Sequence, residues 1–118
     1  QQKQRVYSEN TAYVLKKLLQ QPIIGDNGTA KTCQIDGFEV SAKTGTTDNY
    51  YDKWLCGFTS YYTAVTWYGF DENEDVDYYL SSNPAASLWD AVMTPVHSGL
   101  ASKYFSSTFT ASTSAINI

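Results

Sequence analysis

The amino-acid sequence predicts an α+β fold in which an antiparallel sheet is flanked by helices. Apolar residues recur at helical spacing near both ends of the chain, whereas the middle is rich in tyrosine and threonine and alternates between apolar and polar residues, as strands do. At 118 residues the chain is long enough for one small domain and too short for two. We therefore expect a helix, three antiparallel strands and a second helix, in that order.

The first helix is expected over residues 9–20, ENTAYVLKKLLQ, with Ser8 as its N-cap. Its apolar residues lie at helical spacing and are expected to face the protein interior, namely Ala12, Leu15, Leu18 and Leu19. The lysine pair at 16–17 is expected to point outward. Pro22 ends the helix, and a loop is expected at residues 25–28.

Three strands are expected in the middle of the chain. Residues 38–44 alternate between two faces, with the apolar side chains and Thr44 on one face and Glu39, Ser41 and Lys43 on the other. Residues 48–52 are predicted to form a turn or short loop. The strands at 53–59 and 62–70 follow closely enough to form an antiparallel hairpin.

The second helix is expected to begin at Asn83 and Pro84, because asparagine caps helices and proline fits the first helical position. Its apolar stripe consists of Trp89, Val92, Met93, Val96 and Leu100. Pro95 is expected to bend or break this helix.

The bulk composition excludes some classes of function. The net charge is −4 and the basic residues are scattered, which argues against a nucleic-acid partner. Cys33 and Cys56 lack metal-ligand spacing and are expected to be buried free thiols, although a single bridge between them stays open. The sequence has no apolar run long enough to span a membrane, and its polar first residues are not expected to form a signal peptide. No cofactor is expected.

Three motif-like segments are expected to be structural. GDNGTAKT at 25–32 nearly matches a phosphate-binding loop, but Ala30 replaces the second glycine and a helix precedes it. DENEDVD at 71–77 resembles a calcium loop, but Val76 replaces the required glycine. We expect both to be solvated loops. His97 is the single histidine and is expected to be structural or exposed.

The tripeptide Lys43-Thr44-Gly45 is the candidate functional feature. Lys43 is expected to project from the polar face of its strand, and Gly45 would let an extended ligand lie against the backbone. The Thr44 and Thr46 hydroxyls offer hydrogen-bond donors to a carboxylate. An ordinary strand end, with a lysine reaching into solvent, is the alternative.

Four segments in sequence order carry a resemblance to a known family: SENTAYVLKKLL, GTA, SAKTGTTDNYYDKWLCGFTSYYTAVTWYGFDEN and NPAASLWDAVMTPVHSGL. Together they resemble the C-terminal half of a class A penicillin-binding protein transpeptidase domain, from about residue 8 to about residue 105. The resemblance implies that residues 1–118 are the C-terminal portion of a penicillin-binding/β-lactamase-like fold, with a Ser/Thr-rich tail at 106–118. Ala42 departs from the glycine that commonly precedes the lysine in that family.

Such enzymes have three signatures, S-x-x-K, S-x-N and K-T-G, and only K-T-G is present here. Ser8-Glu9-Asn10 and Ser81-Ser82-Asn83 match S-x-N in letters, but both are expected to be helix starts. We therefore expect the nucleophilic serine to lie upstream and this chain to be inactive alone.

The resemblance implies serine acyl transfer from D-Ala-D-Ala stem peptides of peptidoglycan, which cross-links them and is inhibited by β-lactams. Lys43 would face the serine of S-x-N, and the backbone N–H of Thr46 would complete the oxyanion hole. Substrate or β-lactam would be bound by Thr44, Gly45, Thr46 and Thr47. The tryptophans at positions 54, 67 and 89 are expected to pack the sheet against its helices.

The implied partners are stem peptides, β-lactams and the upstream remainder of the domain, in the same or a separate chain. The implied location is extracytoplasmic, with a membrane anchor upstream. Three alternatives stay open: a β-lactamase or D,D-carboxypeptidase relative, a non-catalytic sensor or structural domain, and a carbohydrate-binding module.

Overall fold

The computed structural model describes residues 2–105, and the predicted tail at 106–118 lies outside them. The helices are α1 (Glu9–Leu18), α2 (Gln21–Ile24) and α3 (Pro84–His97), and the strands are β1 (Ser41–Thr46), β2 (Asp52–Phe58) and β3 (Thr63–Gly69). Three short 3-10 turns are η1 (Lys31–Cys33), η2 (Asp48–Tyr50) and η3 (Asp77–Tyr79). The predicted α+β class is confirmed.

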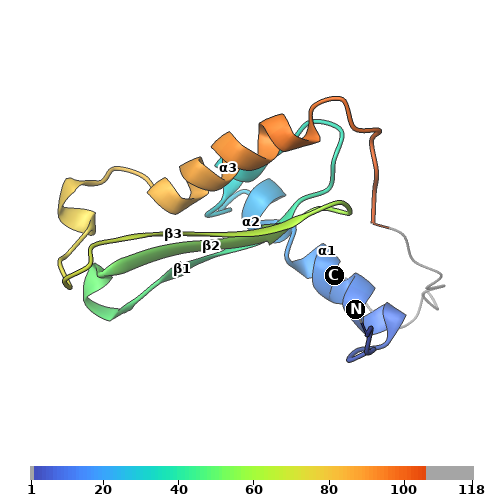
Figure 1. The fold of residues 1–118 in the computed structure, drawn as a ribbon, viewed down its shortest axis with the longest axis horizontal. Coiled ribbons are helices and arrows are strands. Elements are labelled where there is room, and N and C mark those ends of the chain that lie inside the picture. The colour runs from blue at the N-terminus through green and yellow to red at the C-terminus, as the bar shows by residue number, and fades with distance from the viewer. Residues whose placement is uncertain (1, 106–118) are drawn as a thin grey trace.

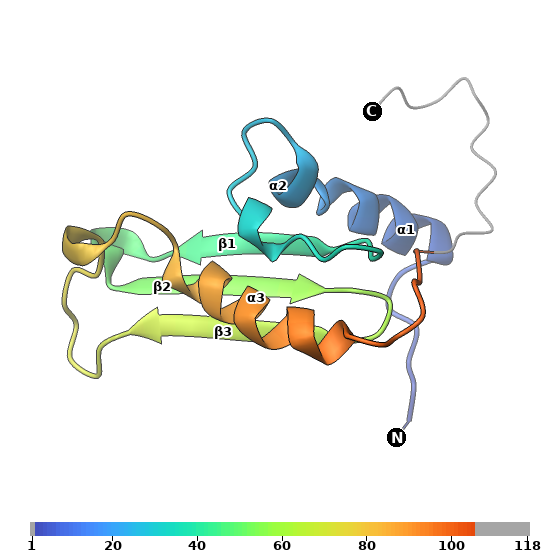
Figure 2. The ribbon, with the colours of Figure 1, turned by 90° about the horizontal axis from the view of Figure 1, so that it is seen from above.

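The three strands form one antiparallel sheet in the order β1-β2-β3. Lys43 lies opposite Cys56, and Thr46 lies opposite Lys53. Helix α3 covers one face of this sheet (Figure 1). Helices α1 and α2 lie beside the β1 edge, and the C-terminal end of β1 extends beyond α2 (Figure 2). The predicted hairpin of the second and third strands is therefore confirmed.

The core lies between the sheet, α3 and the segment that runs from α2 to β1. Its buried residues are Ile23, Ala30, Cys33, Ile35, Val40, Ala42, Leu55, Ala85, Ala86, Trp89 and Met93. Trp89 is fully buried, and its indole N–H donates to Ala64 O at 3.1 Å. A Cβ atom on Gly57 would lie 2.9 Å from Trp89, so a glycine is required for the sheet to approach this ring.

Helix α3 begins as predicted, but its buried stripe differs. Asn83 Oδ1 accepts hydrogen bonds from the N–H groups of Ala85 and Ala86, and the helix continues through Pro95 to His97. Val92 and Val96 are about half exposed, whereas His97 is buried. The expected burial of the two valines was wrong because His97, four residues after the buried Met93, occupies the inner face.

His97 has a structural role, which is one of the two possibilities that the sequence left open. Its Nδ1 lies 2.7 Å from Met93 O, and its Nε2 lies 2.7 Å from Thr59 Oγ1. A carbonyl only accepts, so Nδ1 donates to Met93 O, and the ring joins α3 to Thr59 after β2. The ring also meets Phe38 edge-on, with 4.9 Å between ring centroids.

Helix α1 is rotated relative to the prediction. Leu15 and Leu18 are 46% and 43% exposed, whereas the two lysines at 16–17 are partly buried. The helix meets β1 through polar contacts, since Ser41 Oγ donates to a carbonyl of α1 at 2.6 Å. The apolar side, which also includes Val14, is not covered by the described residues.

Glu39 ties α1 to the segment after α3. One carboxylate oxygen pairs with Lys17, and the other accepts from the Phe105 N–H at 2.6 Å. Burial acts to raise the pKa of Glu39, but these hydrogen bonds outweigh burial, and the pKa is lowered from its usual value. Glu39 therefore stays ionised, which explains why Lys17 turns inward.

Two of the three tryptophans do not pack against helices. Trp54 and Trp67 are each 40% exposed, and their rings contact each other across β2 and β3, tilted by 51° with centroids 6.4 Å apart. Side chains alternate along a strand, so the neighbour Leu55, which is buried in the core, places both indoles on the face away from α3. The expectation held only for Trp89.

The two thiols lie in different environments and are not bridged. Cys33 is buried as predicted, whereas Cys56 is exposed on the sheet face away from α3. Among residues 2–105 no group of acidic, cysteine or histidine side chains is arranged to hold a metal ion. Within the same range no helix is long and apolar enough to cross a membrane.

The two thiols should differ in reactivity. Burial, assisted by the nearby charge of Asp90, raises the pKa of Cys33 to about 12, so its reactive thiolate is scarce at pH 8. We expect iodoacetamide to label Cys56 in the native protein and Cys33 only after unfolding, as measured by peptide mass spectrometry. Equal labelling of both in the native protein would contradict this burial.

Removing the cap of α3 should destabilise the protein. Asn83→Ala leaves two N–H groups at the helix start without their acceptor, and we expect the free energy of unfolding to fall by about 1 kcal/mol in urea denaturation. Asn83→Asp keeps an acceptor at the same position and should retain nearly all of the stability. Equal losses in both variants would show that the cap is not responsible.

Candidate functional site

The candidate site is the outer edge of β1, which has no neighbouring strand among the described residues. The Ala42 N–H donates outward to Leu19 O at 2.9 Å, and the Thr47 N–H donates inward to Asp52 O at 3.2 Å. N–H groups alternate in direction along a strand, so the Thr44 and Thr46 N–H groups point outward with that of Ala42. No described backbone carbonyl accepts from either. An extended ligand could pair with this edge.

Lys43 lies beside this edge, on the sheet face away from α3. It is exposed and borders an open cavity of about 470 Å³ that α2 and the loop at 25–29 line on the other side. Its Nζ donates to Thr44 O at 2.8 Å. The prediction that Lys43 projects from the polar face is confirmed.

Thr29 is a neighbour of the site that the sequence analysis missed. Its hydroxyl lies 3.2 Å from that of Thr44, so the loop before β1 contacts the first threonine of the candidate motif. In the sequence, only the family resemblance pointed to this loop. That resemblance included Gly28-Thr29-Ala30 but assigned these residues no role. No spacing in the sequence links this loop to the strand.

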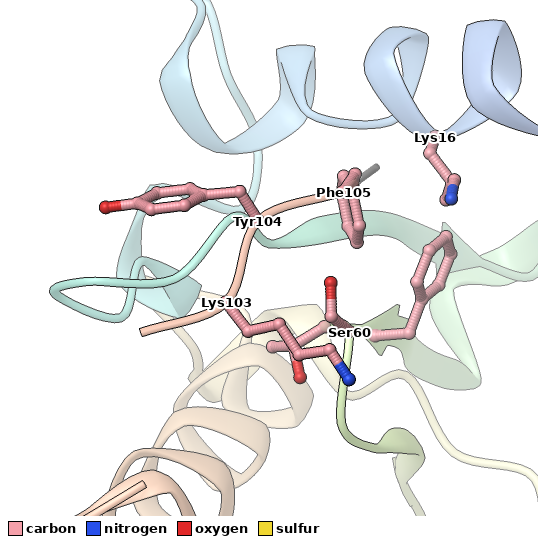
Figure 3. A pocket seen from close by; sticks show the side chains of 7 residues that line it. Lys16, Ser60, Lys103, Tyr104 and Phe105 are labelled. Carbon is pink, nitrogen blue, oxygen red and sulfur yellow. The ribbon is translucent and has the colours of Figure 1, made fainter. Parts of the chain in front are cut away.

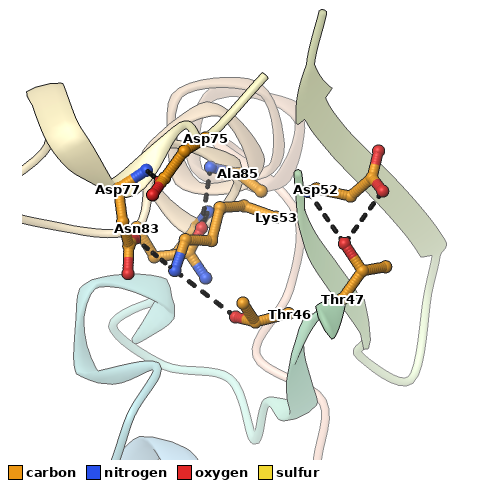
Figure 4. A network of polar contacts seen from close by, with 9 residues as sticks. Thr46, Thr47, Asp52, Lys53, Asp75, Asp77, Asn83 and Ala85 are labelled. Carbon is orange, nitrogen blue, oxygen red and sulfur yellow. Dashed lines mark hydrogen bonds and ion pairs between the residues drawn. The ribbon is translucent and has the colours of Figure 1, made fainter. Parts of the chain in front are cut away.

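Thr46 contacts a second lysine. Lys53 Nζ lies 3.4 Å from Thr46 Oγ1 and forms an ion pair with Asp77 at 2.6 Å (Figure 4). The sequence analysis did not single out Lys53 or Asp77. Their contact depends on the register of β1 and β2 and on the path of the acidic loop.

Thr47 is engaged within the hairpin (Figure 4). Its hydroxyl donates to Asp52 Oδ2 at 2.9 Å and accepts from the Asp52 N–H at 3.0 Å. The other carboxylate oxygen of Asp52 accepts from the indole N–H of Trp67 at 2.8 Å. The Asp52 carboxylate of β2 thus contacts both the residue that follows β1 and the indole of Trp67 on β3. Substrate binding by Thr47 stays a prediction, since its single hydroxyl proton is already used.

Gly45 faces away from α3, next to an indole. A Cβ atom on Gly45 would lie 3.3 Å from Trp54 Cβ, which is tighter than ordinary contact. The missing side chain therefore accommodates Trp54, its cross-strand partner. Room for a ligand at Gly45 stays a prediction.

A second open cavity, of about 360 Å³, lies where Phe58 and the segment at 103–105 meet α1 (Figure 3). Lys16 lies over the ring of Phe105 at 5.1 Å, and Lys103 over the ring of Tyr61 at 5.0 Å. Both lysines are thus engaged with aromatic rings, and this cavity is not part of the β1 edge.

Both S-x-N look-alikes are helix starts, as predicted. Ser8 Oγ accepts from the Thr11 N–H at 3.1 Å at the start of α1, and Asn83 caps α3. Neither segment is part of the β1 edge. The β1 edge itself offers the outward N–H groups of Thr44 and Thr46 and the exposed ammonium group of Lys43, which suit an anionic, extended ligand.

Comparison with known proteins shows the family to which the chain belongs. Residues 1–94 match the penicillin binding protein transpeptidase domain. The chain is 36% identical over 96 residues to penicillin-binding protein 1A of Clostridium botulinum, covering 81% of this chain and 11% of that relative. It is 34% identical over 89 residues to penicillin-binding protein 1A of Clostridium acetobutylicum, covering 75% of this chain and 11% of the relative.

Penicillin-binding protein 4 of Bacillus subtilis is 33% identical over 89 residues, which are 75% of this chain and 14% of the relative. The chain thus spans little more than a tenth of the length of these curated relatives. It belongs to the penicillin-binding protein transpeptidase family and corresponds to a fragment of a class A member.

The link between Thr47 and Asp52 should stabilise the end of β1. Thr47→Val and Asp52→Ala should each lower the free energy of unfolding by about 1 kcal/mol, since each removes a hydrogen-bond partner. Because the two side chains bond to each other, the loss in the double variant should be smaller than the sum of the two single losses. Additive losses in urea denaturation would show that the two residues act separately.

Proposed function

We propose that this chain supplies one wall of the active site of a serine-type D,D-transpeptidase that cross-links peptidoglycan stem peptides and reacts with β-lactams. The observation that carries the proposal is the pair of outward N–H groups of Thr44 and Thr46 beside Lys43. A stem peptide ending in D-Ala-D-Ala is extended and anionic. It could pair with the edge through its backbone and place its carboxylate among the threonine hydroxyls.

In this proposal the Thr46 N–H donates to the oxygen that becomes negative as the serine attacks the peptide carbonyl. Lys43 supplies positive potential to the serine of S-x-N, and Thr44 and Thr46 hold the donor carboxylate. Gly45 keeps the strand surface free of a side chain. The nucleophilic serine lies upstream and forms the acyl-enzyme, which an amine of a second stem peptide resolves. No cofactor is needed for this chemistry.

The uncovered side of α1 supports the need for an upstream part of the same domain. Leu15 and Leu18 line an open cavity with Val14, and apolar surface of this kind is stabilised when another segment buries it. We infer that the upstream part of the domain covers this side and also carries the serine. The same upstream sequence would supply an anchor that holds the protein outside the cytoplasmic membrane.

The isolated chain should not react with penicillin. We expect no covalent label when residues 1–118 alone are incubated with a fluorescent penicillin and separated by denaturing electrophoresis. The full-length protein that contains this segment should be labelled, at an upstream serine identified by peptide mass spectrometry. Stable labelling of the isolated chain would contradict an upstream nucleophile, and an unlabelled full-length protein would favour a non-catalytic domain.

Removing the Thr46 N–H should slow acylation more than removing its hydroxyl. Proline lacks the N–H and is tolerated on edge strands where that group faces outward. In the full-length protein we expect Thr46→Pro to lower the acylation rate by about 10²–10³-fold, as loss of one oxyanion-hole donor does. Thr46→Val keeps the N–H and should have a much smaller effect. Equal rates for the two variants would contradict the assigned role.

A further inference from the structure

Lys53 is a mostly buried charge that the proposed chemistry leaves unused. It lies on β2 directly opposite Thr46, so both side chains project from the same face of the sheet. Only 13% of the Lys53 side chain is exposed. Lysine is rarely buried unless its ammonium group is paired, and the groups that pair it here lie next to the candidate site.

Groups from three segments surround the Lys53 ammonium, and Figure 4 shows two of them, Thr46 and Asp77. Asp77 forms an ion pair at 2.6 Å, the Tyr50 ring centre lies 5.6 Å away, and Thr46 Oγ1 lies 3.4 Å away. The backbone of Asp77 is held within the loop, because its N–H donates to Asp75 Oδ1 at 2.8 Å. The acidic loop therefore holds Lys53 in place beneath the end of β1.

The acidic loop is in turn attached to the turn that follows β1. The buried Val76 donates its N–H to Tyr50 O at 2.8 Å. The positions of Lys53 and Thr46 are thus set by one connected unit, made of the hairpin turn and the loop at 71–77. This attachment accounts for the packing of the loop at 71–77 against this end of the sheet.

The contact with Lys53 determines what the Thr46 hydroxyl can do. An ammonium group donates hydrogen bonds and has no lone pair, so Thr46 Oγ1 accepts in this contact. The hydroxyl proton of Thr46 then points elsewhere, and among residues 2–105 no hydrogen-bond acceptor meets it. We propose that Lys53 is a positioning residue that holds the Thr46 hydroxyl as a donor to the carboxylate of the ligand, an inference that rests on the proposed function.

Orientation is the main contribution of Lys53, because Asp77 neutralises most of its charge at 2.6 Å. A paired charge attracts a distant anion weakly. The effect should therefore depend on whether the ligand carries a carboxylate, and it should act only through the Thr46 side chain. A purely structural lysine would affect every ligand equally.

The experiment uses the full-length protein that contains this segment and two β-lactams, a penicillin and a matched compound in which hydrogen replaces the carboxylate. The measured quantity is the second-order rate constant of acylation. We expect Lys53→Met to slow the penicillin reaction by about three- to tenfold, as expected for one hydrogen bond, and the other reaction by less than about twofold. Lys53→Arg should restore the penicillin rate, since a guanidinium group also only donates.

Two further variants separate orientation from stability. Lys17→Met breaks a comparable ion pair with Glu39 outside the site and should leave the ratio of the two rate constants unchanged. In a Thr46→Val background, Lys53→Met should cause no additional loss. Equal slowing of both compounds, or an additional loss in the Thr46→Val background, would overturn this inference while leaving the proposed function intact. A wild-type protein that penicillin does not acylate would overturn the proposed function and this inference together.

Discussion

The backbone hydrogen bond from Ala42 N–H to Leu19 O fixes the direction of every N–H group along β1. Ala42 is the outward-facing residue of β1 nearest α2. The outward N–H groups of Thr44 and Thr46 therefore lie past the helices and have no backbone acceptor among the described residues. At the other end of β1, the contacts between Thr47 and Asp52 keep the inward N–H group of Thr47 paired with β2. A change in this pairing by one residue would exchange the outward and inward donors. The proposed oxyanion-hole and carboxylate contacts all depend on this one alternation.

Polar contacts attach both helical ends of the fold to the sheet. Glu39 stays ionised between Lys17 and the Phe105 N–H, and His97 joins α3 to the loop after β2 through Thr59. Because these contacts turn the polar side of α1 toward β1, its leucines are left uncovered by the described residues. The same arrangement that positions the candidate edge therefore leaves an apolar side for another part of the domain.

Local patterns predicted the elements better than their orientation. Asn83 and Pro84 marked the start of α3 correctly because capping depends on neighbouring residues only. The lysines of α1, the valines of α3 and two tryptophans were assigned to the wrong sides, because burial there depends on partners distant in sequence, such as Glu39 for Lys17. Lys43 was placed correctly from strand alternation. Lys53, Asp77 and Thr29 could not be predicted, since strand register and loop path bring them to the site.

Amide hydrogen exchange of β1 tests the central claim most directly. In the full-length protein, the account predicts that the Thr46 amide exchanges rapidly before reaction and becomes protected once penicillin has acylated the serine. The Thr47 amide, already bonded to Asp52 O, should be protected in both states. A Thr46 amide that is protected without ligand, or that exchanges equally fast in the acylated protein, would contradict the account.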